Sequence, residues 1–217
     1  MIAYEMPKDP KNPWKTYLID DSMHLTHNMT SKVLEIEHTE TIFIGGKEGV
    51  KSFSFKNGAW DASMNQESII ENHSVGELSL AEISEYGMLL AAVEPMHGNQ
   101  VTVYLQPPGK SKTNQLTRIV LDESLKEGHG IVTGDFLGNG MPQLIAGSRM
   151  PNEAGEFGIK LYEPLDDSYS EFKTYWIDKN GMALESLTAA DLNGDGKLDI
   201  IAAGRSTNNL KIYWNRN

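Results

Sequence analysis

The chain has 217 residues, which is long enough for one domain with a sizeable hydrophobic core, and 39% of them are hydrophobic. Its 19 basic and 30 acidic residues give a net charge of −11, which argues against nucleic acid as a partner because a phosphate backbone would be repelled. The longest apolar runs, such as residues 89–93, are too short to cross a bilayer, and the absence of cysteine excludes disulfides, thiolate nucleophiles and cysteine metal sites.

The N-terminal region contains one predicted strand. Residues 1–13 form an N-terminal extension that lacks the basic, apolar and small-residue regions of a signal peptide. The sequence therefore assigns no localisation, and an extracytoplasmic one would follow if the chain were part of a longer exported precursor. Residues 14–19 are typical of the outer strand that ends each later repeat.

A repeat of about fifty residues organises the rest of the chain. In residues 17–28, 119–130 and 175–186, an apolar strand ends in Asp, and a His or Glu follows seven residues later. The aligned positions are Asp20 with His27, Asp122 with His129 and Asp178 with Glu185, and a weaker copy at 68–78 adds Glu77. The steps between the four His or Glu positions are 50, 52 and 56 residues, which is the length of a propeller blade.

Each repeat contains the same succession of strand-like segments. A half-buried strand follows the His or Glu, and a strand of small residues, an alternating strand and an outer strand come next. Four such strands per repeat predict an all-β fold, a β-propeller of four-stranded antiparallel blades. A β-sandwich of hairpins is the alternative. The expected blades lie in a single domain of residues 1–217, at about 27–70, 77–121, 129–177 and 185–215.

The two ends of the repeat array complement each other. The last repeat ends at its third strand, residues 210–214, whereas residues 14–19 form an outer-type strand without a blade. Two arrangements follow from this. The N-terminal strand closes a ring of four blades and leaves no exposed edge, or the four blades are part of a larger propeller.

Residues 191–199, DLNGDGKLD, form the clearest chemical motif. Five of its residues offer the oxygen ligands that calcium prefers: the side chains of Asp191, Asn193, Asp195 and Asp199 and the carbonyl of Lys197. Residue 202 is Ala where an EF-hand needs Glu, so the motif predicts a structural calcium site between two strands. The alternative is an Asx-rich turn without an ion. A second loop, residues 135–143, has Leu137 and Gln143 at ligand positions and is not expected to bind calcium tightly.

Segment 188–215 is similar to FG-GAP or VCBS-type repeats, whose units are propeller blades with calcium loops. More narrowly, six segments together resemble the propeller domain of aldos-2-ulose dehydratase-like proteins: 26–28, 45–50, 94–101, 127–140, 158–167 and 202–215. This resemblance implies elimination of water from keto-sugars such as anhydrofructose. It also implies a propeller of more than four blades, often with a cupin domain, but the chain has no cupin-like set of histidines.

A candidate site follows from the strand order. Loops before the innermost strands and loops between the second and third strands emerge on one face of a propeller, opposite the calcium loop, because each strand reverses the chain direction. The mouth of the central funnel would be ringed by His27, Glu77, His129 and Glu185. Just outside it would stand Lys47, Glu94, His97, Arg149 and Arg205. Three histidines without equivalents in other repeats are expected at the surface: His24, His38 and His73.

The funnel residues suit β-elimination next to a carbonyl, in which a base removes the α-proton, a cation stabilises the enolate and an acid protonates the departing hydroxyl. The expected base is His129 or His27, the expected cation is Lys47, Arg149 or Arg205, and the expected acids or metal ligands are Glu77 and Glu185. Alternatively, one divalent metal is held by His27, His129, Glu77 and Glu185, as Zn²⁺, Mn²⁺ or Mg²⁺ beside the structural Ca²⁺.

Two functions stay open at this point. The first is a carbohydrate-active lyase or dehydratase that acts on keto-sugars at the funnel. The second is a non-catalytic, calcium-stabilised propeller module that binds carbohydrate or protein. The expected partner is a sugar-type small molecule or a protein, and the sequence specifies no oligomeric state.

Overall fold

The structure is a computed structural model that describes residues 1–34, 39–60, 68–83, 87–106 and 116–217. The regular secondary structure of these residues consists of β-strands, without an α-helix. The described segments accordingly contain no helix with the length and hydropathy to span a membrane. His38 lies outside the described residues.

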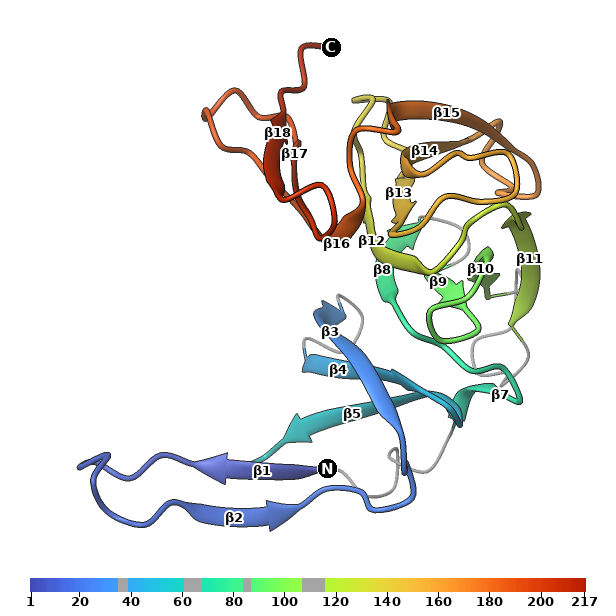
Figure 1. Cartoon of the computed structure of the whole chain (residues 1–217). Helices are drawn as coiled ribbons and strands as arrows, with labels where there is room; N and C mark the ends of the chain where they lie inside the picture. Colours follow the sequence, from blue (N-terminus) through green and yellow to red (C-terminus); the bar gives the residue numbers. More distant parts are fainter. Residues whose placement is uncertain (35–38, 61–67, 84–86, 107–115) are drawn as a thin grey trace.

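Four antiparallel sheets follow one another along the chain and form the blades of a propeller (Figure 1). Blade 1 contains β3 (Thr26–Leu34), β4 (Thr39–Gly46), β5 (Gly49–Lys56), β6 (Ala59–Trp60) and β7 (Ser68–Glu71). Blade 2 contains β8 (Leu78–Ile83), β9 (Gly87–Glu94), β10 (Gln100–Leu105) and β11 (Thr117–Asp122). Blade 3 contains β12 (Gly128–Gly134), β13 (Gln143–Ser148), β14 (Gly158–Pro164) and β15 (Phe172–Lys179), and blade 4 contains β16 (Leu184–Ala190), β17 (Asp199–Gly204) and β18 (Asn209–Tyr213). The predicted all-β propeller of antiparallel blades is confirmed.

The first strand of each blade is the innermost one. In blades 2, 3 and 4 the strands are neighbours in chain order, and in blade 1 both β6 and β7 pair with β5. Blades contact one another through their first strands, because β3 contacts β8, β8 contacts β12 and β12 contacts β16. The residues that begin these strands are therefore brought close together from distant parts of the sequence.

The hydrophobic core lies between neighbouring blades. In β9, Leu90 belongs to the cluster shared with Phe43 of blade 1, and Leu89 belongs to the cluster shared with Leu144 of blade 3. Successive side chains of a strand point to opposite faces, which explains why this strand is apolar along its whole length. A third cluster joins Ile145 of blade 3 to Leu184 of blade 4. The blades are thus held together by apolar burial, at about 25 cal/mol for each Å² removed from water.

The four blades form an open arc (Figure 1), so the structure does not have the first of the two predicted arrangements, a ring closed by residues 14–19. β2 (Lys15–Leu18) pairs with β1 (Ile2–Glu5) in a hairpin that extends from blade 1 (Figure 1). β18 is the outer strand of the three-stranded blade 4. Pairing within the hairpin closes a short loop, which costs less chain entropy than bringing β2 to a strand almost two hundred residues away.

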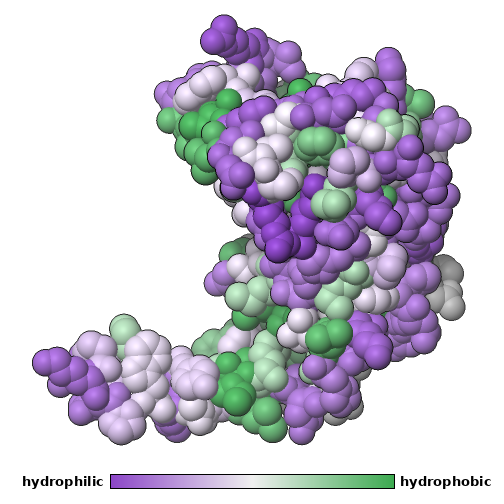
Figure 2. All heavy atoms as spheres, viewed as in Figure 1, coloured by the Kyte–Doolittle hydropathy of each residue, from purple (hydrophilic) through white to green (hydrophobic). Residues whose placement is uncertain are grey.

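The side of the arc between the hairpin and blade 4 is open (Figure 2). Hydrophobic residues gather at the surface of blade 4 in this view. Leu210 and Ile212 of β18, and Trp214 after it, are among the exposed large hydrophobic residues. The last strand therefore keeps an apolar side in contact with solvent.

The Asp at the end of the outer strands of blades 2 and 3, and its counterpart Asp20 after the N-terminal hairpin, each tie one segment to the blade that follows. Asp122 of β11 accepts hydrogen bonds from Lys160 and Tyr162 of β14, at 2.8 and 2.9 Å. The same contact recurs along the chain: Asp178 binds Lys211 and Tyr213 at 2.7 and 2.6 Å, and Asp20 binds Lys51 at 3.5 Å. The Asp that marks the repeat in the sequence is therefore a structural contact between blades.

Candidate functional site

Three histidines from three blades converge. His27 lies on β3 of blade 1, His97 lies in the loop between β9 and β10 of blade 2, and His129 lies on β12 of blade 3. One ring nitrogen of each lies within 4.8 Å of those of the other two. Among the described residues, they form the one group of three or more His, Asp or Glu side chains whose donor atoms converge closely enough to hold a cation. We call this group the histidine triad.

Irregular backbone aims the repeated side chains at the site. In blades 1, 3 and 4 the register shifts once near the start of the innermost strand, and each shift brackets the repeat position, which holds His27, His129 and Glu185. A bulge of this kind turns a side chain out of the regular alternation of a strand. The repeat position is thus a bulge that points a polar group away from the sheet.

Hydrogen bonds fix the orientation of two triad rings. His27 Nδ1 lies 3.0 Å from the carbonyl oxygen of Gly76, so it donates its proton there and leaves a lone pair on Nε2. This Nε2 lies 2.5 Å from Nε2 of His97, whose Nδ1 accepts a hydrogen bond from Arg149 at 3.0 Å. His97 therefore carries its proton on Nε2 and donates it to His27.

Glu77 lies beside the triad and is nearly buried, with 5% of the residue exposed. Its Oε2 accepts a hydrogen bond from Asn28 at 2.6 Å. Its Oε1 lies 3.4 Å from His27 Nδ1 and 3.5 Å from His129 Nε2. Within the described part of the chain, Glu77 Oε1 and His129 Nδ1 are buried without a hydrogen bond. Such atoms cost free energy, and they mark a place where a cation or a ligand fits.

Burial lowers the pKa of both His97 and His129, because the charged imidazolium would lose its water. The positive charge of Arg149 lowers these pKa values further, and the carboxylate of Glu77 raises them without reversing the shift. Both rings are therefore neutral at neutral pH. Neutral imidazole is the form that binds a metal ion.

Arg149 connects the triad to Glu185. Its guanidinium nitrogens lie 2.8 Å and 2.7 Å from the two carboxylate oxygens of Glu185. Burial raises the pKa of Glu185, but the hydrogen bond and charge of Arg149 outweigh this effect and lower it. Glu185 is therefore ionised and paired with Arg149. In the structure His27, His129 and Glu77 lie close together, whereas Glu185, the expected fourth metal ligand, is paired with Arg149. His97, expected just outside the funnel mouth, lies in the triad.

Three other predicted residues lie apart from the triad. Lys47 and Arg205 are exposed, and in the described part of the chain neither side chain forms a hydrogen bond or ion pair. The charge of Arg205 helps to lower the pKa of Glu185. The expected place of Glu94 outside the funnel mouth is corrected, because its buried carboxylate binds Arg118 at 2.6 Å and the hydroxyl of Tyr104 within blade 2. Glu94 therefore supports its own blade.

The loop of residues 191–199 is organised around two carboxylates. Asp191 accepts backbone hydrogen bonds from Gly194 and Gly196 at 2.7 and 2.9 Å. Asp199 is fully buried and accepts one from Leu192 at 3.1 Å. The two glycines have φ values of 77° and 83°, a conformation that glycine adopts without strain. Calcium binding in this loop stays a prediction.

In the second loop, residues 135–143, the neutral side-chain amide of Gln143 forms hydrogen bonds with the backbone N–H groups. The side chain of Gln143 is fully buried, and its oxygen accepts hydrogen bonds from the N–H groups of Phe136 and Leu137 at 2.7 and 2.9 Å. Its nitrogen donates to Asn139 at 3.0 Å. This is the physical reason to expect no tight calcium binding here.

Calcium is expected to raise the Tm of chelator-treated protein. At a concentration 100-fold above Kd, one bound ion stabilises the folded state by about 2.7 kcal/mol, which is a rise of about 5–11 °C in a domain of this size. Asp195→Asn should reduce the rise, since it removes one charge but keeps an acceptor for the N–H of Lys197. Asp135→Asn in the second loop is the control and should leave the rise unchanged. Thermal unfolding with and without calcium checks this, and an unchanged wild-type Tm would show that the loop holds no ion.

Comparison with known families agrees with the fold. Residues 135–202 match the family model described as FG-GAP-like repeat. The match begins at the second loop, covers β13 to β16 and includes the whole of residues 191–199. No curated protein matches the chain, and no comparison supports the narrower resemblance to aldos-2-ulose dehydratase-like proteins. Residues 135–202 of this four-blade β-propeller are therefore similar to an FG-GAP-like repeat.

Proposed function

We propose that the protein is a metal-dependent carbon–oxygen lyase that removes water from a sugar-type hydroxy-carbonyl compound at the histidine triad. The observation that carries the proposal is the convergence of His27, His97 and His129 beside the buried, unpaired oxygen of Glu77. Three imidazoles with further coordination positions open are the donor set of many catalytic zinc sites.

The triad fits a divalent cation in its chemistry. His27 offers Nε2 because its Nδ1 is held by the carbonyl of Gly76, which is the outer contact that orients many metal-binding histidines. Nitrogen ligands of a tetrahedral zinc ion are about 3.3 Å apart, so the rings of His27 and His97 would separate slightly from their 2.5 Å contact. Binding through Nε2 of His97 would move its proton to Nδ1, and Arg149 would then keep Glu185 as its acceptor.

The side chains around the triad supply the remaining chemistry. A bound cation would polarise the substrate carbonyl and make the α-proton more acidic. Glu77 would accept that proton as the C–H bond breaks and return it to the hydroxyl that leaves with the C–O bond pair, so that a C=C bond and water form. Arg149 would donate to the enolate oxygen. Glu185, ionised by its contact with Arg149, would orient the guanidinium.

The test is the metal dependence of turnover. Purified protein is treated with chelator, reconstituted with zinc, manganese or magnesium, and assayed with anhydrofructose for the ultraviolet absorbance of an unsaturated carbonyl product. We expect turnover to disappear with the chelator and to return with one metal ion per chain beyond any calcium. Turnover that survives full metal removal would contradict the proposal. A loaded triad without turnover would point to a binding module.

A further inference from the structure

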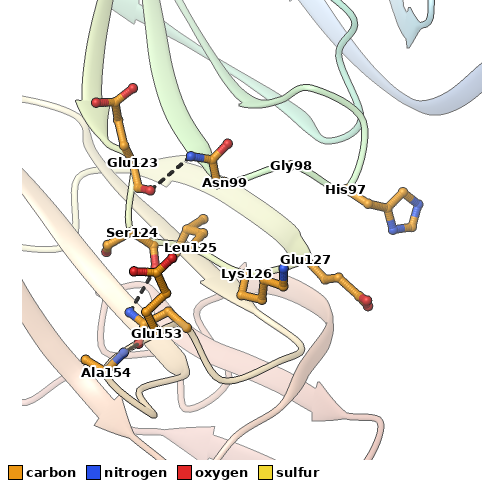
Figure 3. Close-up of a pocket in the computed structure, with 11 residues that line it drawn as sticks. His97, Gly98, Asn99, Glu123, Ser124, Leu125, Lys126, Glu127, Glu153 and Ala154 are labelled. Carbon is orange, nitrogen blue, oxygen red and sulfur yellow. Dashed lines mark hydrogen bonds between the residues drawn. The ribbon is translucent and has the colours of Figure 1, made fainter.

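A pocket of about 710 Å³ opens next to the triad, between blades 2 and 3 (Figure 3). Its walls are the loop between β9 and β10, the loop between β11 and β12, and the loop between β13 and β14. His97 lines the pocket and also belongs to the triad. The volume lies in the range of about 300–1,000 Å³ that is usual for small-molecule sites. Sequence reasoning did not identify this pocket.

Hydrogen bonds between the three loops preform the pocket. The side chain of Asn99 donates to the carbonyl of Glu123, and that of Asn152 donates to the carbonyl of Ser124, both at 3.0 Å. Figure 3 shows these two contacts within the wall. The backbone N–H of Leu125 donates to Asn99 at 3.2 Å. A wall that is already ordered reduces the entropy that a ligand must overcome on binding.

Two lining residues have strained backbone. His97 has a φ of 56° and Glu127 has a φ of 49°. This left-handed backbone region is unfavourable for residues other than glycine. Backbone strain of this kind persists where the surroundings enforce it and is concentrated at binding sites. The two residues stand in different loops of the pocket, and five other non-glycine residues of the described chain share this backbone conformation.

The charged side chains of the lining carry an excess of negative charge. Glu123, Glu127 and Glu153 are carboxylates, and Lys126 is the cation among the described lining residues. Glu127, Glu153 and Lys126 are exposed, and their side chains form no hydrogen bond or ion pair with the rest of the described structure. Leu125 is buried in the core behind the wall. The free groups are therefore hydrogen-bond acceptors beside one donor.

We infer that this pocket binds a polyhydroxylated small molecule, the size of a mono- or disaccharide, that is neutral or positively charged. Hydroxyl and ammonium groups would donate to the carboxylates of Glu127 and Glu153, and Lys126 would donate to a ring or hydroxyl oxygen. An anionic analogue is disfavoured by the two excess negative charges. His97 borders both sites, and a ligand that extended from the pocket past His97 would reach the triad. That last point rests on the proposed function, whereas binding in the pocket does not.

A charge series with one ring tests the inference. Glucosamine, glucose and glucuronate share a pyranose ring and differ in charge, and each is titrated into ¹⁵N-labelled protein in the presence of chelator. We expect saturable shifts of the backbone amides of residues 97–99, 123–127 and 152–154, with glucuronate binding about tenfold more weakly than glucosamine. The double variant Glu127→Gln and Glu153→Gln should bring the two affinities together. Glu171→Gln, in the loop between β14 and β15 at the other end of blade 3, is the control and should leave them unchanged.

The outcomes separate this inference from the proposed function. Two results would contradict the inference that the pocket binds such a ligand. One is equal affinity for glucuronate and glucosamine, and the other is amide shifts that map away from the three loops. Sugar binding at the loops without metal uptake or turnover would leave the pocket valid and contradict the lyase. Metal-dependent turnover without any shift of the amide signals of the three loops would support the lyase and contradict ligand binding in the pocket.

Discussion

Replacing His129 by alanine is expected to lower turnover by more than about 10²-fold and to remove the metal ion from the triad. Loss of an outer contact of a metal ligand costs about 10- to 100-fold, and His129 would be a ligand itself. His129 Nδ1 forms no hydrogen bond among the described residues. The substitution therefore removes no hydrogen bond at this atom, and the chain should still fold. The measurements are kcat with the keto-sugar and metal content per chain.

A matched histidine controls for the loss of an imidazole. His73 is exposed and lies outside the triad, so His73→Ala should keep both metal content and turnover. His129→Gln keeps a polar side chain of similar length and separates a folding defect from a binding defect. Full turnover in both His129 variants would refute the site assignment.

Asp122→Ala is expected to destabilise the protein by about 3–5 kcal/mol, the cost of breaking a buried ion pair by removing one partner. The Lys160 ammonium, whose side chain is 9% exposed, would lose its carboxylate, and the buried Tyr162 hydroxyl would lose its acceptor. Urea unfolding at neutral pH measures the change. Asp167→Ala, at an exposed loop position, is the control and should leave the midpoint unchanged.

The same contact predicts a pH dependence. Burial raises the pKa of Asp122, but hydrogen bonds from Lys160 and Ser124 outweigh this effect, so its folded-state pKa lies below the ordinary value. The stabilisation is therefore present above the unfolded pKa of about 3.9 and is lost as the pH falls through the lower folded-state value. The difference between wild type and Asp122→Ala should shrink at acidic pH. A loss below about 1 kcal/mol at neutral pH would show that the contact is not a main tie between blades.

The blades could be predicted from the sequence because their physical requirements are local. Alternating side chains of one strand must pack against two neighbouring blades, which makes strands such as β9 apolar throughout. The role of β2 could not be predicted in the same way. Whether β2 pairs with β1 or with β18 depends on the relative stability of a local hairpin and a long-range pairing, and both partners have acceptable strand sequences.

The candidate site was predicted in part. The repeat spacing groups His27, Glu77, His129 and Glu185, since equivalent positions of a propeller face its axis. In the structure the first three lie close together, whereas Glu185 is paired with Arg149. The spacing does not identify the Arg149–His97 contact or the support that Asn28 gives to Glu77, because these depend on bulges and on the positive φ of His97. The repeated Asp residues carry an equally strong spacing signal and are structural. Spacing alone therefore does not distinguish a site from a tie between blades.

X-ray absorption spectroscopy and anomalous diffraction of the zinc-loaded protein test the central claim most directly. We expect one zinc ion bound by His27, His97 and His129, with nitrogen ligands at about 2.0–2.1 Å. A triad without zinc, or zinc bound by the carboxylates of residues 191–199 instead, would contradict it.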